Sequence, residues 1–145
     1  ICMFLKPYTR TAYYYETDQM AIIHHSNYIR WMEEARLDLL DQIGLNYRSI
    51  EEANLLIPVL SVSCNYQTLV HYDDTIIIET ELEQFNGLRF TLSYKIYSKD
   101  RTILHATGSS SHCFLDKNFK PVRLKKDYPM IYQTLLKLKN NVKQN

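Results

Sequence analysis

The sequence contains little glycine, proline or cysteine. Only 3 glycines and 4 prolines occur in 145 residues, which leaves little room for long flexible linkers between domains. The 3 cysteines, Cys2, Cys64 and Cys113, are odd in number and widely scattered, so they show neither a disulfide framework nor the spacing of a zinc site. We therefore expect one domain in a reducing, cytoplasmic compartment.

Net charge and long apolar runs are also scarce. A formal net charge of +1 argues against bulk electrostatic binding to nucleic acid or to an anionic membrane. No apolar run is long enough to span a bilayer, and residues 1–5 are too short to be expected as a signal peptide. A hydrophobic content of 46% with 23% charged residues is instead typical of a globular chain with one sizeable core.

One long helical pattern lies in the first third of the chain. Apolar residues recur at spacings of three and four from Tyr28 to Ile43, and charged residues fall mainly on the opposite side. Ser26 or Asn27 suits the position that caps the start, and Gly44 suits the position just past the end. The N-terminus of such a helix offers free backbone N–H groups and a positive dipole, which can stabilise negative charge that develops on an oxygen.

The rest of the chain predicts an antiparallel sheet. A first strand is expected within residues 3–14, where Pro7 favours an edge position. Side chains alternate with a period of two in residues 60–67, 76–83 and 90–96, and a last strand is expected over residues 102–115. Asn86 and Gly87 predict a tight hairpin. Gly108 lies among small residues of the last strand, which would let a helix lie close to the sheet.

Two shorter helices are expected outside the sheet. Ser49 and Glu52 have the spacing of a capping box for a short helix around residues 49–53, within a connection over residues 45–57. A C-terminal helix is expected over residues 127–139, with Pro129 in its first turn, and residues 140–145 should fray. Residues 1–145 thus predict a single α+β domain, in which an antiparallel sheet of about five strands wraps around one long helix. Such a sheet leaves an edge exposed, which dimerisation would cover.

Three motifs surround Asp18 and the start of the long helix. They are Tyr15-Glu-Thr-Asp-Gln-Met20, His24-His-Ser-Asn-Tyr28 and Trp31-Met-Glu-Glu-Ala-Arg36. Together they resemble the hotdog-fold acyl-CoA thioesterases, in the branch that includes 4-hydroxybenzoyl-CoA thioesterase and the YbgC-like enzymes. The resemblance extends over nearly the whole chain. It departs from the family at one point, because the family usually has glycine where this chain has Ala21.

The resemblance implies an enzyme that hydrolyses an acyl-CoA to the free acid and coenzyme A. Asp18 would be the catalytic carboxylate, acting either as general base on water or as nucleophile on the thioester carbonyl. The backbone N–H of His25 would polarise the carbonyl oxygen, beside an apolar tunnel along the helix. The candidates for contact with the substrate are Ala21, His24, Tyr28, Arg89 and Arg123.

The resemblance also implies which metals, cofactors and partners to expect. No metal and no separate cofactor is expected, because coenzyme A is part of the substrate and because the adjacent side chains of His24 and His25 should diverge. The expected assembly is a homo-oligomer, either a dimer or a dimer of dimers (a homotetramer). Nucleic acid and a membrane span are not expected.

Several candidates also have ordinary structural explanations. Asp18 would fit a residue that caps a turn, His24 would fit plain packing, and His112 would fit a structural histidine with satisfied hydrogen bonds. Glu34 on the helix is a second candidate for the acid, with a surface ion pair as its alternative. The sequence leaves two other functions open, a hotdog dehydratase or hydratase and a non-catalytic acyl-thioester binding protein. It does not choose the acyl group, or between coenzyme A and acyl carrier protein.

Overall fold

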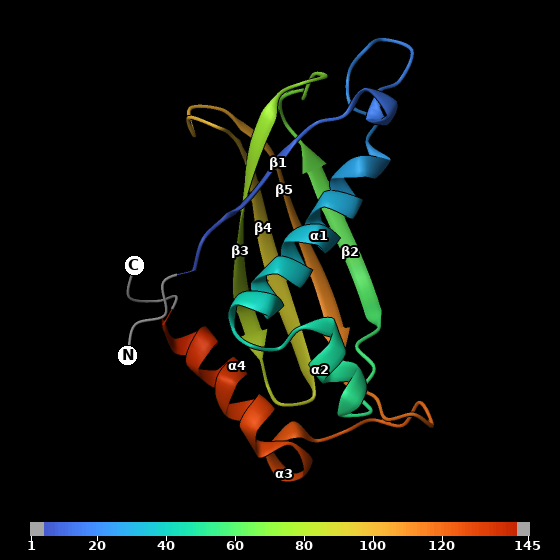
Figure 1. The fold of residues 1–145 in the computed structure, drawn as a ribbon, viewed down its shortest axis with the longest axis vertical. Helices are drawn as coiled ribbons and strands as arrows, with labels where there is room; N and C mark the ends of the chain where they lie inside the picture. Colours follow the sequence, from blue (N-terminus) through green and yellow to red (C-terminus); the bar gives the residue numbers. More distant parts are fainter. Residues whose placement is uncertain (1–4, 142–145) are drawn as a thin grey trace.

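A five-stranded antiparallel sheet dominates the computed structural model, which describes residues 5–141 (Figure 1). The sheet has the spatial order β1-β3-β4-β5-β2, so the predicted α+β architecture is confirmed and β1 lies at an edge, as Pro7 indicated. The expected first residues of that strand, Met3 and Phe4, lie outside the described residues. The strands are β1 (Tyr8–Thr11), β2 (Val59–Tyr66), β3 (Thr75–Phe85), β4 (Arg89–Ser98) and β5 (Leu104–Cys113).

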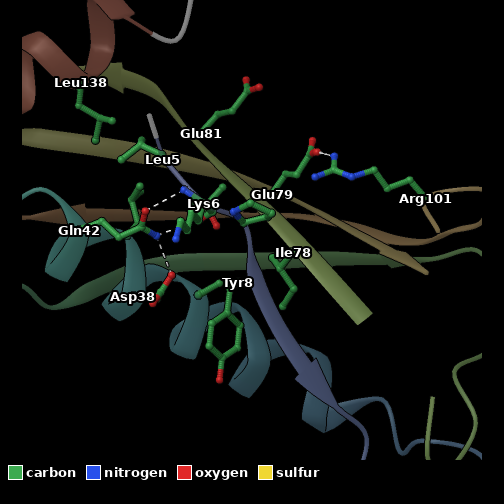
Figure 2. Close-up of a pocket in the computed structure, with 14 residues that line it drawn as sticks. Leu5, Lys6, Tyr8, Asp38, Gln42, Ile78, Glu79, Glu81, Arg101 and Leu138 are labelled. Atoms are coloured by element: carbon green, nitrogen blue, oxygen red, sulfur yellow. Dashed lines mark hydrogen bonds and ion pairs between the residues drawn. The ribbon is translucent and has the colours of Figure 1, made fainter. Parts of the chain in front are cut away.

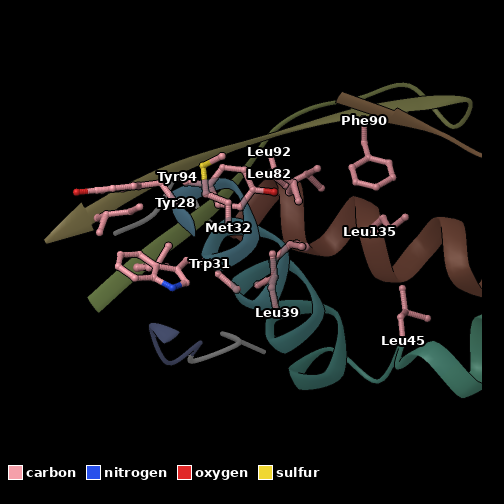
Figure 3. Close-up of a cluster of buried hydrophobic side chains, with 14 of the residues drawn as sticks. Tyr28, Trp31, Met32, Leu39, Leu45, Leu82, Phe90, Leu92, Tyr94 and Leu135 are labelled. Carbon is pink, nitrogen blue, oxygen red and sulfur yellow. The ribbon is translucent and has the colours of Figure 1, made fainter. Parts of the chain in front are cut away.

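The long helix α1 (Ser26–Gln42) crosses one face of this sheet (Figure 1). Its apolar stripe faces the core as the spacing predicted, although Leu40 and Ile43 are only partly buried, and Gly44 lies just past the end with a φ of +83°. Figure 3 shows side chains of α1 pointing toward those of the sheet and of the C-terminal helix, which together make the core. The buried residues of α1 are Tyr28, Trp31, Met32, Ala35 and Leu39.

The start of α1 differs from the prediction. His25, not Ser26 or Asn27, is the residue that precedes the helix, and its own side chain makes no capping hydrogen bond. Ser26 already belongs to the helix, and its hydroxyl lies 2.9 Å from His24 Nδ1. Asn27 instead donates its side-chain amide to the carbonyl of Glu16 at 2.9 Å. The prediction was wrong because the preceding loop supplies these contacts, which a pattern of neighbouring residues does not reveal.

The shorter helices follow the prediction with shifted boundaries. In α2 (Tyr47–Glu52) the cap is Asn46, whose side chain accepts the N–H of Ser49, so the predicted capping box is wrong. Pro129 begins α4 (Pro129–Asn141), which extends through the expected start of the frayed tail; residues 142–145 lie outside the described part. Two further short elements, η1 (Tyr14–Glu16) and α3 (Leu124–Asp127), were not predicted separately. None of the helices in residues 5–141 has the length and apolar character that crossing a bilayer requires.

His112 is a fully buried histidine on β5. Its Nε2 lies 2.7 Å from the hydroxyl of Ser110, which is also 2.7 Å from the hydroxyl of Tyr94. Its Nδ1 has no hydrogen-bond partner among the described residues, so the expectation of a satisfied histidine holds for one ring nitrogen only. Burial, with the nearby guanidinium of Arg36, lowers the pKa of His112 to about 4.

We expect the free energy of unfolding to fall as the pH drops from 6.5 to about 4. In this window the unfolded chain binds a proton on His112 that the folded chain does not, so stability present above pH 6.5 is lost, by up to about 3 kcal/mol. Urea unfolding at several pH values measures this loss. His112→Gln should flatten the dependence, whereas His71→Gln, at an exposed position, should not. An equal slope in all three proteins would contradict the assignment.

Candidate active site

Asp18 lies in a tight turn that backbone hydrogen bonds close. Its N–H donates to the carbonyl of Ile22 at 2.8 Å, and the N–H of Ala21 donates to the carbonyl of Asp18 at 3.1 Å. Thr17 and Ile23 form an isolated antiparallel bridge at the base of the turn. The turn therefore holds Asp18, which is half-buried, on the segment that leads directly into α1.

The carboxylate of Asp18 is only partly used by this turn. Oδ1 accepts the backbone N–H of Met20 at 2.8 Å, which is the turn-capping contact expected of an ordinary loop aspartate. Oδ2 has no hydrogen-bond partner among residues 5–141. One oxygen thus fixes the side chain, and the other is available to a ligand.

Ala21 adopts a left-handed backbone conformation in the same turn. Its φ is +62°, a region in which a side chain beyond hydrogen costs roughly 1 kcal/mol. Glycine adopts this conformation without that cost, which gives a physical reason for the glycine usual in the hotdog thioesterases. Ala21 is exposed.

The N-terminus of α1 adjoins the turn through His24 and His25. The N–H of His24 donates to the carbonyl of Glu16 at 2.9 Å, and the carbonyl of His25 accepts the hydroxyl of Tyr66 at 3.1 Å. The backbone N–H of His25 has no acceptor in the described part of the chain. It is therefore a free donor at the positive end of a helix that is 17 residues long.

The two histidine side chains are exposed and stacked. Their ring centroids lie 4.2 Å apart, so the expectation that adjacent histidines diverge is wrong here. The ring of His24 is held by Ser26, whose hydroxyl and backbone N–H both lie within hydrogen-bond distance of Nδ1. No group of three potential metal ligands occurs among residues 5–141. His24 thus borders the free N–H of His25, whereas its ring is engaged by the helix start.

Tyr28 has a structural place beneath the helix start. It is 3% exposed, and its hydroxyl accepts the N–H of Val70 at 3.3 Å. Its ring packs against those of Trp31 and Tyr66. The described contacts of Tyr28 therefore link α1 to the segment after β2, and within the single chain its hydroxyl is not free to face a ligand.

The starts of β4 and of α3, at which Arg89 and Arg123 lie, are at the other end of the molecule from the start of α1 (Figure 1). Arg89 begins β4 after the Asn86–Gly87 hairpin, and Arg123 immediately precedes α3, where the N–H of Leu124 donates to the carbonyl of Gly87 at 3.0 Å. Both arginines are exposed. The single chain brings them near each other but does not bring them to Asp18.

Glu34, the second candidate for the acid, is engaged by β1. Its Oε1 accepts the hydroxyl of Tyr8 at 2.8 Å and lies 3.0 Å from Nε of Arg10. The neighbouring Glu33 forms an ion pair with Arg36 at 3.7 Å. Glu34 is thus part of a polar network, and sequence reasoning missed this network because it assigned no role to Arg10.

A cavity in the described part of the chain lies away from Asp18. It has a volume of about 340 Å³ and lies between the C-terminal half of α1, the start of β1 and β3 (Figure 2). Its lining includes charged residues such as Lys6 and Glu81, and Gln42 joins α1 to Lys6 across it. Neither Asp18 nor His25 lines this cavity. It therefore differs from the apolar tunnel that was expected beside the acid.

The chain is similar in sequence and in fold to known proteins named as thioesterases. The family described as the Thioesterase-like superfamily matches residues 14–133. The chain is 37% identical to the Bacillus subtilis (strain 168) protein named "Putative acyl-CoA thioesterase YneP", over 80% of this chain and 84% of that protein. It is 24% identical to "Acyl-CoA thioesterase YbgC" of Haemophilus influenzae, over 86% and 91% of the two chains. The crystal structure of the DHNA-CoA thioesterase from Staphylococcus aureus superposes with a TM-score of 0.88 at 29% identity, covering 96% of this chain and 93% of that one.

Proposed function

We propose, from the premise that this chain belongs to the thioesterase-like superfamily and has the hotdog fold, that it hydrolyses an acyl-CoA thioester to the free acid and coenzyme A. Relatives named as acyl-CoA thioesterases support hydrolase activity at the level of the family. The proposal for this chain adds the residues that perform the reaction, namely Asp18 and the backbone N–H of His25.

The free N–H of His25 carries the proposal. A thioester carbonyl oxygen that accepts this N–H would gain negative charge at the positive end of α1, and a donor of this kind lowers a barrier by roughly 3–4 kcal/mol. The contact between His24 and the carbonyl of Glu16, two residues before Asp18, holds the acid's turn against the same helix end.

Asp18 would supply the attacking group. As a general base, its carboxylate takes a proton from water while the hydroxide oxygen adds to the carbonyl carbon, and the intermediate then collapses as the carbon–sulfur bond breaks. As a nucleophile, it displaces the thiolate to form a mixed anhydride, which water then hydrolyses. Both routes release coenzyme A as a thiolate, which leaves without a strong general acid. Ala21 and His24 lie between Asp18 and His25 in the sequence, and they are the proposed neighbours of the thioester.

A panel of acyl-CoA thioesters, assayed for release of free thiol, tests this function. Wild-type protein should cleave at least one member, and Asp18→Asn should not. Assay of enoyl-CoA hydration beside thiol release separates hydrolysis from the hydratase alternative. Tight binding of an acyl-CoA without turnover of any member would favour a binding protein and contradict the proposal.

We also propose that two copies of the chain associate through β2. This strand is the second edge of the sheet, and it exposes apolar side chains to solvent, which a second antiparallel copy would bury. Such an antiparallel pair would also bring the end that carries Arg89 and Arg123 toward the partner's active site, within reach of the phosphates of coenzyme A. The exposed apolar residues are Val59, Leu60, Val62 and Tyr66.

We expect the protein in solution to have twice the 17.3 kDa mass of one chain, or four times that mass if dimers pair again. Light scattering after size-exclusion chromatography measures the mass. Val62→Lys places a charge at the edge of the sheet and should yield monomers, because burying an unpaired charge opposes association. Ile103→Lys, which changes an exposed apolar residue in the β4–β5 turn, is the matched control. A monomeric wild type would contradict the β2 interface.

A further inference from the structure

A buried charged network joins the elements that flank the turn of Asp18. Arg10 on β1 and Glu16 on η1 are only 10% and 5% exposed. Nη1 of Arg10 lies 2.6 Å from Oε1 and 2.7 Å from Oε2 of Glu16. The backbone N–H of Tyr13 donates to Oε1, and the indole N–H of Trp31 on α1 donates to Oε2, both at 2.9 Å. Each oxygen of this carboxylate therefore has two donors.

The backbone of Glu16 binds the start of α1 directly. Its carbonyl oxygen accepts the N–H of His24 at 2.9 Å and the side-chain amide of Asn27 at 2.9 Å. His25 lies between these two donors in the sequence. Glu16 is thus held to β1 and α1 through its side chain, and it holds the residues on both sides of the proposed carbonyl donor through its main chain.

Stability alone is a weak explanation for this ion pair. Burial opposes the ionisation of Glu16, but the Tyr13 N–H, the Trp31 indole and the Arg10 guanidinium together lower the pKa of its carboxyl. A buried ion pair is often no more stabilising than apolar side chains of similar volume. The four hydrogen bonds hold the carboxylate in one orientation, whereas apolar side chains of similar volume would not fix an orientation in this way.

We propose that Glu16 is a positioning residue, which sets the placement of Asp18 relative to the backbone N–H of His25. This inference rests on the proposed function, because it assigns a role in the same reaction. Glu16 acts through the turn and the helix start and does not contact the reacting atoms. Arg10 supplies the charge that balances it within the network.

Glu34 offers a matched comparison for Glu16. Both carboxylates bind Arg10, but Glu34 lies on α1, its side chain is 37% exposed, and its other described partner is Tyr8 on β1. Within residues 5–141 its side chain makes no hydrogen bond to the turn of Asp18. Glu34→Gln therefore removes a charge from the same network while leaving the contacts of that turn in place.

The first experiment compares Glu16→Gln with Glu34→Gln in the acyl-CoA assay. We expect Glu16→Gln to lower kcat about 10- to 100-fold with KM within about threefold, because a displacement of about 1 Å can cost a factor of about 100. Glu34→Gln should change kcat less than about threefold. In the Asp18→Asn background, Glu16→Gln should have little further effect on the residual rate. The positioning role would be overturned if both variants lost kcat by the same factor and if this loss followed their losses of stability.

The second experiment does not depend on catalysis. Hydrogen exchange measured by NMR should show faster exchange of the amides of Asp18 and His24 in Glu16→Gln, by about 10-fold or more, while the amide of Leu92 in β4 stays protected. Unchanged exchange with unchanged kcat would overturn the role of Glu16 and leave that of Asp18 untouched. Faster exchange with unchanged kcat would also overturn it, and would show that turnover does not depend on this placement.

A milder substitution covers the case in which Glu16→Gln does not fold. Trp31→Phe removes the indole donor to Oε2 and keeps an aromatic ring in the core. We expect a smaller loss of the same kind, about three- to tenfold in kcat with faster exchange at His24. A folded Trp31→Phe protein with wild-type kcat and wild-type exchange would overturn the proposal.

Discussion

Asp18→Asn should remove most thioester hydrolysis and leave the fold intact. The amide can neither accept a proton from water nor attack a carbonyl, so we expect kcat to fall by about a thousandfold or more. The amide oxygen can still accept the N–H of Met20, which donates to Oδ1 of the carboxylate at 2.8 Å, so the turn should persist. Thiol release from a panel of acyl-CoAs measures the loss, and circular dichroism checks the fold.

Asp116 offers a matched control for this substitution. Its Oδ1 accepts the backbone N–H groups of Asn118 at 2.8 Å and Lys120 at 3.0 Å, so it also holds a turn with its side chain. Asp116→Asn should therefore leave kcat within about twofold. If a folded Asp18→Asn protein still hydrolyses several acyl-CoAs at the wild-type rate, Asp18 is a turn residue only and the proposed mechanism is wrong.

Gly108→Ala should lower the free energy of unfolding by about 2–3 kcal/mol, a large effect for one methyl group. A Cβ at this position on β5 would lie 2.4 Å from Sδ of Met32 and 2.8 Å from the carbonyl oxygen of Ser63. The methionine side chain can move, but the carbonyl belongs to the paired strand β2, so the substitution must separate two strands or lift α1. Urea unfolding of the two proteins measures the difference.

A double-mutant cycle separates these two contacts. Met32→Ala removes the contact with sulfur, so part of the cost of Gly108→Ala should disappear in that background, while the part due to Ser63 remains. Thr107→Ala, at the neighbouring half-buried position on the other face of β5, should cost less than about 1 kcal/mol. An unchanged free energy of unfolding in Gly108→Ala would contradict the close approach of α1 to the sheet.

The contacts of Asp18 fit two roles, that of a residue that caps a turn and that of a catalytic carboxylate. The hydrogen bond from Met20 is the one expected of a loop aspartate, and the free Oδ2 and the unpaired N–H of His25 are what a thioester hydrolase would need. These roles do not exclude each other, because the turn that Oδ1 caps also fixes the direction of Oδ2. The control at Asp116 therefore measures the difference between a carboxylate that caps a turn and one that also faces a substrate.

The sequence identified the elements because their signals are local. The period of α1 and the alternation in β3 and β4 depend on residues one to four positions apart, and all three elements lie where these patterns predicted. The caps were less predictable, because several polar residues near each helix end offer similar contacts. At α2, Asn46 and not Ser49 supplies the capping oxygen, and at α1 His24 accepts the N–H groups of Ser26 and Asn27 and leaves that of His25 free within residues 5–141.

Local patterns in the sequence therefore sufficed to predict the fold class, the long helix and the segment that carries Asp18. The pairing of Arg10 with the buried Glu16 follows from the folded structure alone, because charged residues in a sequence suggest a solvated surface until their partners are known. The fold also sets the start of β4 and α3 at the opposite end of the molecule from the start of α1, since that separation depends on the path of five strands. Local patterns predict how each segment folds. Which side chains face one another depends on contacts between segments far apart in the chain.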